Sequence, residues 1–150
     1  MNWDTAIARE QGAPEKPERA RYFWPSAGRV LIVDDNRDWA ERLALVFTND
    51  GYTVVAEHNS REGVDAAIWF RPDIAVLNIR MAGLSAYDAA RALRRHGTHT
   101  PLLVAVTVLP GEWSKERARK AGFDLYFTKP TDPKVFLEML KATAAGGGLS

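Results

Sequence analysis

The chain has 150 residues, 46% of them hydrophobic, which suits one compact domain with a sizeable core. Its 20 basic and 19 acidic residues leave a formal net charge of +1, so no overall field attracts the protein to nucleic acid or to an anionic membrane. The absence of cysteine excludes disulfides and thiolate chemistry and agrees with a reducing compartment, so we expect a cytoplasmic protein that binds neither nucleic acid nor membrane.

Residues 1–28 differ from the rest of the chain, because three prolines stand among charges with no helical or strand period (Pro14, Pro17, Pro25). We predict an irregular extension outside the main fold. The apolar residues 22–24, Tyr-Phe-Trp, either pack back on the domain or bind a partner, and packing is the more ordinary of the two. The extension lacks the apolar core of a signal peptide, and no run approaches the length of a membrane span.

A regular pattern begins at residue 29, where the apolar run RVLIV ends in two acids. The next stretch, NRDWAERLALVFTNDG, has helical spacing, because its apolar side chains recur three and four positions apart (Ala40, Leu43, Ala44, Phe47). Gly51 is expected to end this helix. These residues predict a strand followed by an amphipathic helix.

The same alternation occurs four more times along the chain. The predicted strands cover residues 52–58, 73–78, 101–107 and 124–128. Each precedes a predicted helix: one with Val64, Ala67 and Ile68 on its apolar face, one with Ala86, Ala89, Ala90 and Leu93, one over residues 112–122, and one over residues 131–148. In the last helix Asp132 can cap the start, Pro133 can take the first position and Gly146 can end it.

The predicted strands are apolar on both faces, as in VLIV and IAVL, which favours a sheet covered by helices on both sides. Crossovers of this length between parallel strands are right-handed, and they give a doubly wound α/β fold over residues 29–144. We expect residues 145–150 to form a short flexible tail.

Polar residues stand where four of the strands end: Asp34 and Asp35, Asn78, Thr107, and Lys129. Each has an ordinary explanation, namely N-caps for the acid pair, an Asx turn for the amide, a turn for the hydroxyl and a solvated lysine. The carboxyl ends of parallel strands meet at one edge of the sheet, however, and ligands bind there. Together the five side chains predict a site for an oxyanion and a hard metal ion.

The motifs VLIVDDN, PDIAVLNIRM, AVT and AGFDLYFTKP, in this order, resemble a response regulator receiver domain of two-component signalling. The resemblance covers residues 29–144 and implies a flavodoxin-like five-stranded sheet in the order 2-1-3-4-5. In that family an acid pair helps to hold Mg²⁺ and an aspartate after the third strand accepts a phosphoryl group. A threonine and a lysine bind the phosphoryl oxygens.

The resemblance assigns family roles to seven residues of this chain. They are Asp34 and Asp35 at the acid pair, Arg80 at the backbone carbonyl lent to the metal, Thr107 at the switch hydroxyl, Tyr126 at the switch aromatic, Lys129 at the lysine, and Asn78 at the phosphoacceptor.

An amide at residue 78 changes the expected chemistry, because it carries no full charge and its lone pair is tied up in resonance. Loss of one carboxylate also weakens a magnesium site, so we expect no required cofactor and only weakly bound Mg²⁺. The neighbouring MAGLSA departs further from the usual family loop, with Ala82 in place of proline, which favours natural divergence over an engineered substitution. An acceptor aspartate replaced by Asn78 remains an alternative, as does phosphorylation of another side chain.

The predicted fourth helix carries an aromatic residue close to basic ones (Trp113, Lys115, Arg119, Lys120). This combination suits a protein interface, although a solvated helix face is the more ordinary interpretation. The expected partners are a histidine kinase or a downstream regulator, or a second copy through the fourth and fifth helices.

We therefore expect a stand-alone, phosphorylation-deficient receiver that acts as a protein-binding signalling module and not as an enzyme. A flavodoxin-like enzyme that binds a nucleotide or flavin is disfavoured, because DDNRD stands where a glycine-rich phosphate loop would be expected.

Overall fold

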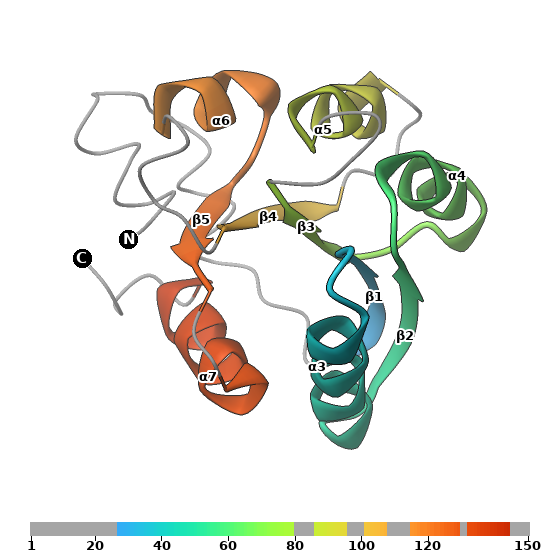
Figure 1. Ribbon diagram of the computed structural model, residues 1–150, viewed down its shortest axis with the longest axis vertical. Helices are drawn as coiled ribbons and strands as arrows, with labels where there is room; N and C mark the ends of the chain where they lie inside the picture. The colour runs from blue at the N-terminus through green and yellow to red at the C-terminus, as the bar shows by residue number, and fades with distance from the viewer. Residues whose placement is uncertain (1–26, 80–85, 96–100, 108–114, 130–131, 145–150) are drawn as a thin grey trace.

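The computed structural model describes residues 27–79, 86–95, 101–107, 115–129 and 132–144. Five parallel strands form one sheet in the order β2-β1-β3-β4-β5, with helices on both of its faces (Figure 1). The predicted fold class and strand order are therefore confirmed.

The elements alternate along the chain as the sequence pattern predicts. The strands are β1 (Gly28–Val33), β2 (Tyr52–Glu57), β3 (Ile74–Asn78), β4 (Leu102–Thr107) and β5 (Leu125–Thr128). The described helices are α3 (Arg37–Asn49), α4 (Ser60–Phe70), α5 (Ala86–Arg95), α6 (Lys115–Ala121) and α7 (Pro133–Ala144).

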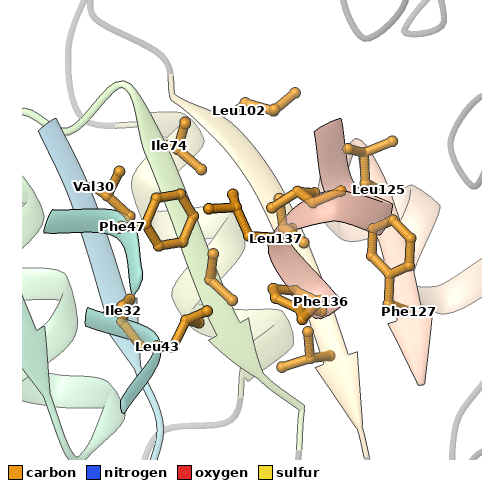
Figure 2. Close-up of a cluster of buried hydrophobic side chains, with 14 of the residues drawn as sticks. Val30, Ile32, Leu43, Phe47, Ile74, Leu102, Leu125, Phe127, Phe136 and Leu137 are labelled. Carbon is orange, nitrogen blue, oxygen red and sulfur yellow. The ribbon is translucent and has the colours of Figure 1, made fainter. Parts of the chain in front are cut away.

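The core consists of two buried layers, one on each face of the sheet. Neighbouring residues of the central strands enter different layers, because side chains alternate along a strand. Val30 and Ile32 face α3 and α7, where Phe47 and Phe136 also lie (Figure 2). The other layer packs against α4, α5 and α6 and is built largely from alanine on the helix side.

The start of α3 shows that the acid pair does not cap this helix, which was the ordinary explanation of these two residues. The N-cap is Asn36, whose side chain accepts a hydrogen bond from the backbone N–H of Trp39 at 3.1 Å. Asp34 and Asp35 are therefore not the caps of this helix. At the other end Gly51 follows the helix with φ = 102°, a left-handed value that glycine adopts without strain.

The buried face of α4 differs from the prediction. Ile68 was expected to face the sheet, but 50% of its surface is exposed. The residues of α4 that face the sheet are small. Gly63 lies so close to Val33 that an added Cβ would come within 2.8 Å of the Val33 methyl groups, so a larger residue would not fit there. Because the small residues of α4 face the sheet, Ile68 lies on the solvent side of the helix. The spacing of apolar residues does not reveal this close approach.

The start of α7 agrees with the prediction. Asp132 Oδ1 accepts a hydrogen bond from Lys134 N at 2.9 Å, and Pro133 takes the first helical position. The residues described in the structure include no helix with both the length and the apolar character of a membrane span. The aromatic residues 22–24, Gly146 and residues 145–150 lie outside the described ranges.

A buried ion pair joins α5, β4 and β5 at the edge of the sheet opposite the polar strand ends. Arg94 Nη2 donates to Asp124 Oδ2 at 2.8 Å, and the same oxygen accepts from Leu103 N at 2.8 Å. The guanidinium also donates to the carbonyl oxygens of Gly122 and Pro101. We call Arg94 and Asp124 the Arg94–Asp124 pair.

Candidate functional site

The carboxyl ends of β1, β3, β4 and β5 bring four of the predicted site residues to one edge of the sheet: Asp34, Asn78, Thr107 and Lys129. Backbone hydrogen bonds hold these strand ends together. Lys129 N donates to the Thr107 carbonyl at 2.7 Å, and Ile79 N donates to the Val106 carbonyl at 2.8 Å. The sheet therefore sets the position of these side chains.

Asp34 is the centre of the site. It is 1% exposed, yet both carboxylate oxygens have partners. Oδ1 accepts from the Asn78 amide at 3.0 Å and from Asn36 N at 2.9 Å, while Oδ2 lies 2.8 Å from Lys129 Nζ. A buried carboxylate is tolerated when it is paired and hydrogen-bonded in this way.

Lys129 is not an ordinary solvated lysine, because its side chain is only 5% exposed. Its ammonium pairs with Asp34 and also lies 4.4 Å from the centre of the Trp39 ring. A cation over an indole face at this distance is attracted by the ring quadrupole.

Asn78 ends β3 and is buried. Its Nδ2 donates to Asp34, and an aspartate at this position could not donate in its ionised form. The amide therefore removes a like-charge repulsion and adds a hydrogen bond to the one deeply buried carboxylate described at these strand ends.

Thr107 and Tyr126 are both buried, on neighbouring strands. Burial raises the pKa of the Tyr126 phenol well above its ordinary value, and the nearby Tyr87 hydroxyl raises it further. Tyr126 belongs to the core layer that α5 and α6 cover. The aromatic ring thus lies inside the domain.

The raised pKa of Tyr126 predicts a loss of stability in alkali. Above about pH 10 the unfolded chain loses the phenolic proton while the folded protein keeps it, so the free energy of unfolding falls as pH rises. We expect Tyr126→Phe to make this fall shallower, measured by urea unfolding at a series of pH values. Below about pH 9 the two proteins should show the same pH dependence. Equal slopes in alkali would contradict the assignment.

The described side chains fit a divalent cation poorly. Asp35 is exposed, but Asp34 already has an ammonium on one oxygen and two N–H donors on the other. A cation would have to displace Lys129, and the Asn78 amide presents a donor to Asp34. Within the described ranges, no three His, Asp or Glu side chains form a group that could hold a metal ion. Arg80 lies outside them.

The proposed partner surface is only partly described. Lys120 on α6 is largely exposed, whereas Arg119 pairs with Glu116 at 2.7 Å and lowers the pKa of that carboxyl. Arg117 lies 4.1 Å from the Tyr87 ring centre and covers it. Trp113 and the side chain of Lys115 lie outside the described residues.

Sequence reasoning missed three residues of the site. Asn36 has the signal of an N-cap, since asparagine precedes a helical pattern. Trp39 has no such signal, because its contact with Lys129 joins residues far apart in the chain. His58 also contacts the site, since its Nδ1 donates to the Asp34 carbonyl oxygen at 3.0 Å.

Comparison with known proteins identifies a family that shares this sequence. The family model for the response regulator receiver domain matches residues 30–141. Protein PilH of Pseudomonas aeruginosa is 30% identical over 119 residues, which cover 79% of this chain and 98% of PilH. A nitrate/nitrite response regulator protein homolog of Haemophilus influenzae is 33% identical over 120 residues, 79% of this chain and 57% of that protein. The chain thus spans nearly all of one relative and little more than half of the other.

Solved structures share the fold. The chemotaxis response regulator CheY4 of Vibrio cholerae superposes with a TM-score of 0.69 at 21% identity, covering 77% of this chain and 97% of that one. A CheY-like response regulator receiver domain protein of Methanospirillum hungatei gives a TM-score of 0.66 at 25% identity, and the superposition covers 79% of this chain and 94% of that one.

Proposed function

The chain belongs to the response regulator receiver family of two-component signalling, and from this premise we propose that it is a phosphorylation-deficient receiver that signals by binding another protein. Asn78 would stand where the family has its acceptor aspartate. The aligned region covers 98% of PilH, so a receiver of this size occurs as a protein by itself in that relative.

One contact carries the proposal, the hydrogen bond from Asn78 Nδ2 to Asp34 Oδ1. A phosphoacceptor needs a free carboxylate oxygen as the nucleophile, and residue 78 instead offers a neutral amide whose nitrogen is already engaged. Asp34 is itself occupied by Lys129 and by backbone N–H. Neither side chain supplies an accessible anionic nucleophile, so no enzymatic phosphoryl turnover is expected.

The proposed partner is a protein, either a histidine kinase or a downstream regulator, in the cytoplasm. Exposed Lys120 on α6 contributes a cation to the surface that such a partner would meet. Self-association through α6 and α7 is the alternative mode of contact. No cofactor is required, any Mg²⁺ binds weakly, and binding to nucleic acid or membrane is not expected.

Incubation with acetyl phosphate and Mg²⁺, followed by intact-mass measurement, tests the proposal. We expect no phosphorylated species from the natural chain, because residue 78 cannot attack phosphorus. A receiver that carries an aspartate at the acceptor position serves as the positive control for the reagent. A stable adduct of one phosphoryl group on the natural chain would refute the proposal and support another acceptor.

A further inference from the structure

The Lys129 ammonium lies between a carboxylate and an aromatic face. Asp34 Oδ2 is 2.8 Å from Nζ, and the Trp39 ring centre is 4.4 Å from it. The lysine comes from the end of β5, the carboxylate from the end of β1 and the indole from the first turn of α3. We call these three residues the Lys129 cage.

The indole cannot easily swing away from the ammonium. Trp39 is buried, and its ring packs edge to face on Phe136 of α7 with centroids 5.5 Å apart. Phe136 in turn packs edge to face on Phe127 of β5 at 5.7 Å, and both rings lie in the core layer of Figure 2. The Asn36 cap holds the Trp39 backbone. The cage wall is therefore fixed by the core that joins α3, α7 and β5.

We propose that Trp39 is a positioning residue that holds Lys129 against Asp34 and so withholds the ammonium from an oxyanion that arrives at the carboxyl ends of the strands. An ammonium already stripped of water and satisfied by a carboxylate and an indole must leave both before it can bind an oxyanion. This inference rests on the proposed function and deepens it. The amide at residue 78 and the cage act independently at this site. The amide removes the nucleophile, and the cage keeps the Lys129 ammonium paired.

Lysine reactivity tests the cage without any phosphoryl chemistry. Limited acetylation with an amine-reactive ester, read by peptide mass spectrometry, gives the rate at Lys129 relative to that at exposed Lys120. We expect Lys129 to react slowly in the natural protein. Trp39→Leu should raise the ratio about tenfold, the equivalent of one desolvated cation–π contact. Trp39→Phe should give an intermediate ratio, because the phenyl ring attracts a cation less strongly than indole does.

Phe47→Leu is the matched control, because it trims a ring of the same core layer near the other end of α3, where that ring packs on Tyr52. It should leave the Lys129 to Lys120 ratio unchanged. The proposal is overturned if Trp39→Leu does not raise the ratio, or if Phe47→Leu raises it equally, since core packing in general would then explain the protection. Trp39→Phe carries the same test if Trp39→Leu fails to fold.

A second measurement asks whether the cage limits oxyanion binding. In an Asn78→Asp background, a carboxylate oxygen would attack the phosphorus of acetyl phosphate, the P–O bond to the acetyl group would break, and acetate would leave. With Mg²⁺ present, we expect adding Trp39→Phe to speed this uptake several-fold over Asn78→Asp alone. An equal or lower rate in the folded double variant would contradict the cage. Phosphorylation of the natural chain would instead refute the proposed function. The ratio of Lys129 to Lys120 acetylation would still test the cage in that case, because it involves no phosphoryl chemistry.

Discussion

Asp124→Ala is expected to lower the free energy of unfolding by about 3–5 kcal/mol, the cost of leaving a buried charge without its partner. Asp124 is fully buried, and its Oδ2 accepts hydrogen bonds from Arg94 Nη2 and from Leu103 N, both at 2.8 Å. The truncation removes the carboxylate partner of an Arg94 side chain that is 19% exposed, leaving its guanidinium only carbonyl acceptors, and it leaves the Leu103 backbone N–H without its acceptor. Urea unfolding followed by circular dichroism measures the loss.

The exposed pair Asp88 and Arg91 on α5 provides a matched control at a similar distance, 2.9 Å. Asp88→Ala should change the free energy of unfolding by less than about 1 kcal/mol, because solvent screens the interaction. Asp124→Asn, which keeps an acceptor oxygen and removes the charge, should fall between the two. If Asp124→Ala costs no more than Asp88→Ala, the Arg94–Asp124 pair does not stabilise the fold as inferred.

Asn78→Asp should destabilise the metal-free protein by about 2 kcal/mol at neutral pH. The change removes a donor to buried Asp34 and places a second carboxylate beside the first. Millimolar Mg²⁺ should recover much of this loss, because a divalent cation offsets the added charge, and it should stabilise the natural chain far less. Urea unfolding with and without Mg²⁺ measures both effects.

Asn59→Asp makes the same chemical change at the N-cap of α4, where the side chain accepts from Glu62 N at 2.9 Å. Aspartate caps a helix about as well as asparagine, so little change in stability is expected there. An Asn78→Asp protein as stable as the natural one without Mg²⁺ would show that the amide does not relieve repulsion at Asp34.

The fold and the position of the site could be predicted from local patterns. Alternating apolar runs and helical spacing specified five strand–helix units, and parallel topology then required the strand ends at Asp34, Asn78, Thr107 and Lys129 to share one edge. The cap at Asp132 was predictable, because Asp followed by Pro is a strong helix-start signal. The cap at Asn36 was missed, because the two acids just before it are equally good capping residues.

Tertiary packing decided the rest. Ile68 faces solvent because Gly63 lets α4 approach β1, and a count of apolar residues gives glycine no weight. Which partner Lys129 takes depends on α3, α7 and β5 meeting around Phe136, since that packing places the Trp39 ring over the ammonium. Chain periodicity reports interactions within a helix or strand, whereas residues 39 and 129 meet only after the whole sheet and its helices have assembled.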